Sequence, residues 1–419
     1  MLIQFRFENF RSFRDDTVLD FSATKIREHD YHVVRIGDEK ILPVAGIFGA
    51  NASGKSNVFK AFKFMCTYVE NSFGYGGEDG LLRMAEKNTL YTPFVFDTES
   101  RRAESSFEVF FTRDNDEDGY IYNYGFTLGR EGVNEEWLNR RKASSKTQKK
   151  IFYRDGEDVN LDGLDSGSAE MIRRSLNKNA LIVSLGAMLK IPEATLVKEW
   201  FDSAWIIDFG DPAEMTRRGR QLPADFMDGE DARRKVVEYF SSFDPSIIRL
   251  IPTEKHTVDG KTYTTVASVH NCTDNMPAEI PLEQESAGTL KMLSMYQALE
   301  TVLSEGGLLV VDELNSQLHP LLVRKVLLMF LNPEKNKKHA QLLFITHDAW
   351  QLSNNLLRRD EIWFTEKDEN GVSTLYSLAD FVDEDGSKIR KDESYEKNYM
   401  LGKYGAIPMM REFNFWEEE

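Results

Sequence analysis

The chain has very little cysteine and no long apolar run. Its 419 residues include two cysteines, Cys66 and Cys272, which is too few for a disulfide framework and forms no metal-ligand pattern. No run of about 18 or more apolar residues occurs, so we expect no membrane span. The first residues lack the basic start and apolar stretch of a signal peptide. These absences favour a cytoplasmic protein in a reduced environment.

Positive charge is also scarce, because 52 lysines and arginines face 69 acidic residues and the formal net charge is −17. Bulk charge of this sign repels nucleic acid and favours a protein partner. Two basic clusters are local exceptions: Arg140, Arg141, Lys142, Lys146, Lys149 and Lys150, and then Arg217, Arg218 and Arg220. Each is either a solvated loop or a docking site for an acidic partner or a phosphate backbone. Direct binding of nucleic acid therefore stays open.

One glycine-rich segment satisfies the pattern G-x-x-x-x-G-K-[ST]. It consists of Gly49, Ala50, Asn51, Ala52, Ser53, Gly54, Lys55 and Ser56. An apolar run at 41–48 predicts a buried strand before it, and apolar residues at helical spacing predict a helix over 56–69. Such a loop directs backbone N–H groups and the positive end of a helix at phosphate oxygens. We therefore predict a P-loop that binds ATP, with Lys55 on the β and γ phosphates and Ser56 on Mg²⁺.

Polar residues follow two further apolar strands, predicted at 307–311 and 341–346. Asp312 and Glu313 come directly after the first strand, and His347 follows the second. Asp312 fits the Walker B role of holding Mg²⁺, and Glu313 is placed to orient or deprotonate the attacking water. His347 can bond the γ-phosphate or that water. Carboxyl ends of parallel strands are where ligands bind in open α/β sheets, so we expect these residues to meet.

In this order, the three elements resemble those of ABC-type ATPases, in the soluble branch with the SMC, Rad50, RecF and OLD-like proteins. The segment 9–13, NFRSF, is similar to the N-terminal motif of that branch, so Asn9, Arg11 and Ser12 are implied to lie near the nucleotide. We add Asn57, which comes directly after the P-loop. The segment 285–289, ESAGT, resembles the LSGGQ signature, matching it at Ser286 and Gly288 only. Residues 314–320 are similar to the D-loop and the segment after it.

The resemblance implies that ATP is bound between two copies of the chain. In this superfamily the signature of one subunit completes the ATP site of the other, so Ser286 and the N–H of Gly288 would contact the γ-phosphate in trans. An ATP-sandwich homodimer or a larger assembly would follow. We place no Q-loop glutamine. The absence of a long heptad repeat excludes an SMC or Rad50 coiled coil.

More narrowly, the ESAGT form, the short insertion and the tail at 390–408 resemble prokaryotic ATPases of abortive-infection and restriction loci, such as the PARIS and AbiL systems. Those ATPases work beside a separately encoded effector, often a nuclease. The implied function is a switch ATPase that controls such an effector in anti-phage defence. The alternative is a DNA-repair ATPase of the RecF or OLD type, and an ABC transporter subunit is the weakest alternative.

The length and the 41% hydrophobic content suggest an α/β fold of two lobes with an insertion. We expect an ABC-type ATPase head with an antiparallel β lobe, whose strands include 93–96, 106–112 and 120–128. The expected division is lobe I at 1–154, a mainly helical insertion at 155–245, lobe II at 246–380 and a tail at 381–419. The tail tyrosines either pack on the core as a strand and turn or dock a partner.

Overall fold

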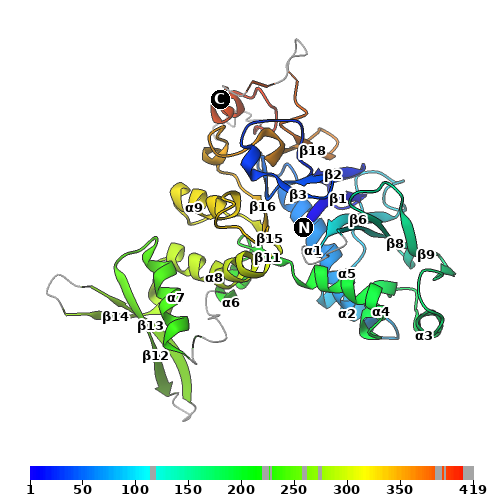
Figure 1. Cartoon of the computed structure of the whole chain (residues 1–419), viewed down its shortest axis with the longest axis horizontal. Coiled ribbons are helices and arrows are strands. Elements are labelled where there is room, and N and C mark those ends of the chain that lie inside the picture. Colours follow the sequence, from blue (N-terminus) through cyan, green and yellow to red (C-terminus); the bar gives the residue numbers. More distant parts are fainter. Residues whose placement is uncertain are drawn as a thin grey trace, which may run out of the picture.

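The computed structural model describes most of the chain. It covers residues 1–113, 119–218, 226, 229–256, 262–271, 276–382, 389–390 and 393–408. Its strands form four sheets of seven, six, three and two strands (Figure 1). The smallest is a hairpin of β3 (Val34–Ile36) and β4 (Glu39–Ile41). In the described residues no helix is both long and apolar enough to cross a membrane.

The seven-stranded sheet is antiparallel and forms the expected β lobe. Its strands, in order across the sheet, are β10 (Asp158–Asn160), β9 (Lys149–Asp155), β8 (Gly132–Lys142), β7 (Tyr120–Gly129), β6 (Ser105–Thr112), β1 (Leu2–Glu8) and β2 (Thr17–Asp20). The strand predicted at 93–96 is wrong. That segment is irregular, and its backbone bonds to the loop at Asn9 instead of to a strand: the N–H of Phe94 donates to the Asn9 side chain at 3.0 Å.

The six-stranded sheet is parallel except at one edge. Its order is β11 (Trp205–Asp208), β15 (Leu308–Asp312), β16 (Gln341–Ile345), β5 (Val44–Gly49), β17 (Ile362–Lys367) and β18 (Ser373–Ser377), with β18 antiparallel. Every residue of β5, β15 and β16 is buried. Continuous apolar strands of this kind are expected where helices or sheets cover both faces of a parallel sheet.

Helix α1 (Lys55–Asn71) lies between the two large sheets, because its apolar side chains share one core with strands of both. Its Phe64 stacks on Phe107 of β6 with ring centroids 5.0 Å apart. The other face of the six-stranded sheet is covered by α8 (Ala287–Glu305) and α9 (Pro320–Leu331). The α/β class, the antiparallel lobe and the helices predicted after residues 56 and 288 are thus confirmed.

The stretch 155–245 is mainly helical, as expected, but its parts pack in different places. Its helices are α3 (Ser166–Ser175), α4 (Ile182–Met188), α5 (Pro192–Asp202), α6 (Pro212–Arg218) and α7 (Glu230–Ser241). Apolar residues of α3, α4 and α5 join the core around α1 and the seven-stranded sheet. Strand β11 instead adds an edge to the six-stranded sheet.

Helix α7 belongs to a third body. It packs on β12 (Ile247–His256), β13 (Thr262–His270) and β14 (Ala278–Pro281), a unit that we call the β-arm. The β-arm projects away from both large sheets (Figure 1). Its small core includes Leu293 and Tyr296 of α8, so the arm is attached to the helix that begins at the signature-like segment.

The tail packs on the core as a helix rather than as a strand. Helix α10 (Tyr395–Met400) buries Tyr395 and Tyr399, and Tyr404 is buried just after it. The ring of Tyr399 stacks on Phe364 of β17 at 5.4 Å between centroids. Helix α2 (Gly80–Glu86) lies far from this tail, at the bottom of the view in Figure 1.

Candidate ATP-binding site

The P-loop connects β5 to α1 at the carboxyl edge of the six-stranded sheet. Gly49 has φ +148° and Gly54 has φ +114°. A Cβ atom at Gly49 would lie 2.5 Å from the Thr365 carbonyl oxygen, and one at Gly54 would lie 2.5 Å from the Ser373 hydroxyl. Both positions therefore require glycine. The loop borders a cavity of about 370 Å³, lined by Asn51, Ala52, Gly54, Lys55, Ser56, Asn57, His347 and Lys367.

The ammonium group of Lys55 is held inside the loop. Its Nζ donates to the carbonyl oxygens of Gly49 at 2.8 Å and Ala50 at 2.7 Å. Burial lowers the pKa of Lys55 to about 8, although the carboxylates of Glu313 and Asp312 oppose this shift. A cation that is desolvated beside an open cavity gains most from an anionic ligand such as a phosphate.

Asp312 and Ser56 meet where Mg²⁺ is expected. The Ser56 hydroxyl donates to the Asp312 carboxylate, and burial is the main reason that the pKa of Asp312 rises to about 6. A desolvated carboxylate next to a hydroxyl is an oxygen donor set that suits Mg²⁺. The described residues contain no group of three or more acidic, histidine or cysteine side chains that could hold a metal alone. These residues fit Mg²⁺ provided that phosphate and water oxygens complete its coordination.

Glu313 and His347 form a pair at the same edge. His347 Nε2 lies 2.7 Å from Glu313 Oε1. Burial raises the pKa of Glu313, but the hydrogen bond with His347 and the charges of His347, Lys55 and Lys291 together lower it more, so the pKa lies below its usual value. Glu313 is therefore held as a carboxylate, the form that can accept a proton from water. The structure brings together Lys55, Ser56, Asp312, Glu313 and His347, as the sequence predicted.

The N-terminal motif lies behind the P-loop rather than in the cavity. Ser12 Oγ accepts from Asn57 Nδ2 at 2.7 Å and from the Ser373 hydroxyl at 2.9 Å. Asn9 is buried and bonds to the carbonyl oxygens of Ser100 and Ala103. Among the described residues that line the cavity, neither of these nor Arg11 appears. Here Asn9 shapes the loop, and Ser12 supports the P-loop through Asn57.

Arg11 is the most accessible residue of that motif. Its guanidinium lies over the Phe10 ring, 5.5 Å from the centroid. Its backbone has φ +54°, in the left-handed region, and its N–H donates to the Thr92 carbonyl at 3.0 Å. Burial lowers the pKa of Arg11. The side chain remains free of ion pairs within the described part of the chain.

The signature-like residues also lie outside this cavity, judged by the described residues that line it. Ser286 is exposed and caps α8, where its Oγ accepts from the Thr289 N–H at 3.1 Å. A Cβ atom at Gly288 would lie 3.0 Å from the Gln317 carbonyl, so the segment abuts the D-loop of its own chain. Glu285, which stands at the leucine position of the LSGGQ pattern, bonds to Ser268 and to His270 of the β-arm, the latter at 2.7 Å.

Asp208 is a site residue that the sequence interpretation missed. It ends β11 and lies opposite Asp312 in the parallel register. Burial is the main cause that raises the pKa of Asp312, and the charge of Asp208 raises it further. Its signal is a short apolar run, 205–207, that ends in a carboxylate, as in β15. The run falls inside the stretch 155–245 that was predicted to be a mainly helical insertion, so no strand was expected there.

Strands β17 and β18 contribute a second missed group. Thr365 Oγ1 lies 2.6 Å from Ser53 Oγ, and the Ser373 hydroxyl donates to the Ser53 carbonyl at 2.8 Å. Lys367 follows on β17 and lines the cavity on the side away from His347. Thr365 and Ser373 thus support the outer flank of the P-loop. Isolated serine, threonine and lysine residues carry no motif by which sequence alone could have found them.

The first basic cluster lies on a β-hairpin rather than on a loop. Arg141 pairs with Glu39 at 2.6 Å, and Arg140 lies 5.0 Å from the centroid of the Tyr120 ring. Lys142, Lys149 and Lys150 are exposed at the end of strands β8 and β9. In the second cluster, Arg218 pairs with Glu214 at 2.8 Å, and Arg220 lies outside the described residues.

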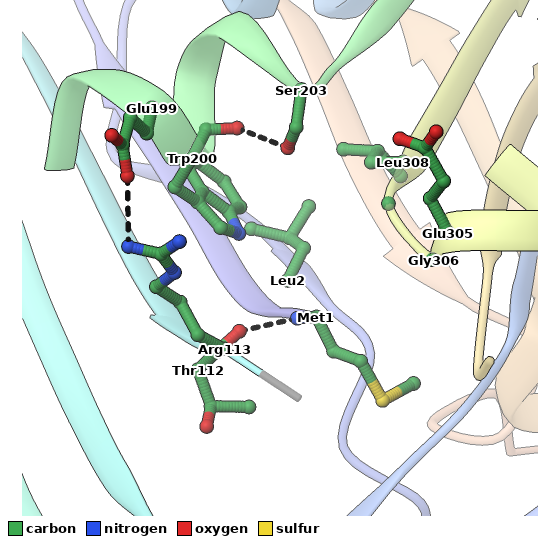
Figure 2. A pocket seen from close by; sticks show the side chains of 11 residues that line it. Met1, Leu2, Thr112, Arg113, Glu199, Trp200, Ser203, Glu305, Gly306 and Leu308 are labelled. Atoms are coloured by element: carbon green, nitrogen blue, oxygen red, sulfur yellow. Dashed lines mark hydrogen bonds and ion pairs between the residues drawn. The ribbon is translucent and has the colours of Figure 1, made fainter. Parts of the chain in front are cut away.

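A smaller cavity of about 160 Å³ lies at the amino end of β15, the edge of the sheet opposite the P-loop (Figure 2). The amino group of Met1 donates to the Thr112 carbonyl there, and Arg113 pairs with Glu199 at 3.1 Å. Both charged groups already have partners within the protein. No charged group of these two pairs is therefore left to bind a phosphate in this cavity.

The fold and the geometry of this edge define a P-loop protein of the α/β class. Residues 44–349 match the family described as "AAA domain, putative AbiEii toxin, Type IV TA system", and the chain belongs to that family. No curated protein matches the chain.

Solved structures similar to the chain include two SMC heads and a recombination mediator. They are an SMC head bound to the C-winged helix domain of ScpA (14% identity, TM-score 0.49), an Smc head domain with a coiled coil and joint from Pyrococcus yayanosii (12%, 0.43), and the recombination mediator RecF with ATP (14%, 0.31). Each comparison covers 90% of this chain and 97% of the other.

Proposed function

We propose that the chain is an ABC-type ATPase that binds ATP with Mg²⁺ and hydrolyses it to ADP and phosphate. The observation that carries this proposal is the convergence of five side chains at one edge of the parallel sheet: Lys55, Ser56, Asp312, Glu313 and His347. They come from three strand ends that are far apart in sequence. Membership of a family of AAA-type domains supports the same conclusion.

Each residue has a chemical role in this reaction. Backbone N–H groups of the P-loop and Lys55 bind the β and γ phosphates. Glu313 accepts a proton from water as the water oxygen attacks the γ-phosphorus, while the bond to the ADP oxygen breaks. His347, hydrogen-bonded to Glu313, keeps that carboxylate oriented. Mg²⁺, held by Ser56 and Asp312, supplies charge neutralisation of the phosphates when bound.

We propose that residues 208–210 take the place of a Q-loop, the segment that would couple the nucleotide to the inserted region. Asp208 is the neighbour of Asp312 on the side of the sheet away from the P-loop. A Cβ atom on Gly210 would lie 3.2 Å from Asp208 Oδ1 and 3.6 Å from Glu313 Cγ, so Gly210 lies between Asp208 and the proposed catalytic carboxylate. A substitution in this loop would therefore disturb the surroundings of Asp312, the proposed Mg²⁺ ligand, and of Glu313, the proposed base.

ATP would be shared between two copies of the chain. Ser286 is exposed and caps a helix whose N-terminal N–H groups can receive an anion. Because Ser286 and Gly288 are not among the described residues lining the cavity of their own chain, a second chain is the natural recipient. The resulting ATP-sandwich homodimer would close on ATP and loosen on hydrolysis.

The cellular role that we favour is control of a separately encoded effector, such as a nuclease, in anti-phage defence. The net charge of −17 supports a protein partner rather than nucleic acid. Direct action on DNA, as in a repair ATPase, is the second candidate. The exposed lysines at the end of strands β8 and β9 favour it.

Phosphate release by the purified chain tests the enzymatic proposal. We expect turnover of ATP with Mg²⁺ and loss of turnover when EDTA removes the metal. Co-purification with the product of the adjacent gene, with and without ATP, separates effector control from direct DNA binding. Stimulation of turnover by duplex DNA, together with no nucleotide-dependent partner, would favour the repair role instead.

A further inference from the structure

Lys291 is a fully buried lysine, and it lies one turn beyond Gly288 on α8. Its Nζ reaches four oxygen atoms in the turn that follows β15. These are the carbonyl oxygens of Glu313 at 2.8 Å, Leu314 at 2.9 Å and Ser316 at 2.7 Å, and the Ser316 hydroxyl at 2.9 Å. The D-loop backbone therefore folds around the ammonium group, with its oxygen atoms directed toward Nζ.

All four of these acceptors are dipoles rather than carboxylates. The ammonium also lies 4.0 Å from the centroid of the Phe209 ring, which adds a cation–π contact. Burying a lysine charge without a carboxylate bonded to it is costly, and burial lowers the pKa of Lys291 to about 7, although the nearby charge of Glu313 opposes this shift. Leucine or methionine would suffice if this core position only had to be filled with apolar atoms. We therefore attribute the lysine to the hydrogen bonds that its charged group donates to the turn.

The turn held by Lys291 is strained at both ends. Glu313 has φ +56° and Gln317 has φ +59°, in the left-handed region that residues other than glycine rarely adopt. Such conformations persist only when the surroundings impose them. The direction of the Glu313 side chain therefore depends on the bonds that Lys291 donates to the backbone of Glu313 and the residues after it.

Through these contacts one ammonium joins three segments of the site. It lies on the helix that carries the signature-like residues, binds the turn of the general base, and touches Phe209, the residue after Asp208. A displacement of α8 would move all three together. Since Tyr239 of the β-arm donates to the Met292 carbonyl at 3.1 Å, the arm is attached to the same turn of α8.

We propose that Lys291 is a positioning residue for ATP hydrolysis, which aims the Glu313 carboxylate and ties the signature helix to the D-loop. This inference rests on the proposed ATPase function. Lys291 does not line the nucleotide cavity, so its loss should spare ATP binding and slow the chemical step.

The test is Lys291→Met in the full chain, with Lys325→Met as its matched control. Lys325 also donates to a backbone carbonyl, that of Ser242 at 2.6 Å, but on an exposed part of α9. We expect kcat of Lys291→Met to fall about 100-fold, as when one preorganised hydrogen-bond donor is lost, with the Kd for ATP within threefold of wild type. Lys325→Met should match wild type in both. A kcat of Lys291→Met within threefold of wild type overturns the proposal.

A double variant separates positioning from general damage. If Lys291 acts through the Glu313 carboxylate, Lys291→Met adds almost nothing to the loss already caused by Glu313→Gln. If it only stabilises the fold, the two losses multiply, which contradicts the proposal.

If Lys291→Met does not fold, Ser316→Ala provides a milder test, because it removes one of the four acceptors and keeps the lysine. We expect kcat to fall several-fold, against no change for Ser304→Ala, whose hydroxyl bonds within the exposed end of α8. An unchanged kcat in Ser316→Ala overturns the proposal. Absence of turnover in the wild-type chain would instead reject the ATPase function itself, so the two failures are distinguishable.

Discussion

Two buried lysines, one in each half of the site, show how differently the same side chain is used. Lys55 in the P-loop bonds to two carbonyl oxygens and borders the cavity. Lys291 beneath the signature-like segment bonds to four oxygen atoms and is fully enclosed. Burial lowers the pKa of both, to about 8 and about 7. The ammonium of Lys55 is placed to bind a ligand in the cavity, whereas the hydrogen bonds of the Lys291 ammonium are all made within the protein.

The two halves differ in the same way. The P-loop half brings together, within one chain, the residues that we propose to bind phosphate and metal and to act as base, whereas the signature-like half has Ser286 on the surface. Its rigidity comes from contacts behind that serine: Glu285 to the β-arm, and Lys291 to the D-loop. If ATP is bound between two chains, each chain needs one half that binds the nucleotide and a second, rigid half that contacts the nucleotide of its partner.

The largest effect should come from the ligand-binding lysine. We expect Lys55→Ala to weaken ATP binding at least about 100-fold, because a charge-assisted contact to phosphate is lost in a desolvated site. Isothermal titration calorimetry measures this directly. Lys87→Ala, at the exposed end of α2, is the control and should bind like wild type. An affinity for Lys55→Ala within threefold of wild type would show that the cavity beside the P-loop is not the ATP site.

Glu313→Gln tests the catalytic role of the P-loop half. Loss of a general base costs about 10²- to 10⁴-fold in rate, and we expect kcat to fall in that range with ATP affinity retained. Because ATP then persists, light scattering should report a doubled mass with ATP and the single-chain mass without it. A single-chain mass at saturating ATP would argue against the ATP-sandwich dimer.

Ser286→Arg tests the signature-like half. A bulky cation on that surface should block closure, so we expect kcat to fall at least about tenfold while the Kd for ATP stays within threefold, since binding uses the other half. Ser304→Arg near the far end of the same helix is the control. Loss of ATP binding in Ser286→Arg would mean that the serine serves its own chain, and the contrast between the halves would disappear.

Sequence alone located the P-loop half well, because a loop that cradles phosphate has few chemical solutions. Gly49, Gly54 and Lys55 occur at a fixed spacing, and apolar runs before Asp312 and His347 mark buried strands. Asp208 was missed because β11 is only four residues long and follows a helix directly. Lys291 was invisible for another reason: on a helix a lysine suggests a solvated face, and its enclosure arises only when the turn after β15 packs against α8. Such tertiary contacts leave no local pattern.

The last prediction concerns stability rather than activity and uses the pKa of Lys291. Its pKa is lowered from 10.5 to about 7 by burial, so between these values the unfolded chain binds more protons than the folded one. The free energy of unfolding should therefore rise with pH relative to Lys291→Met, by on the order of 2 kcal/mol from pH 7 to pH 9. Denaturant titrations of both proteins at the two pH values measure this difference, and Lys325→Met should follow wild type. If the free energy of unfolding changes equally with pH in wild type and in Lys291→Met, Lys291 keeps an ordinary pKa. The contrast with Lys55 would then be one of geometry alone.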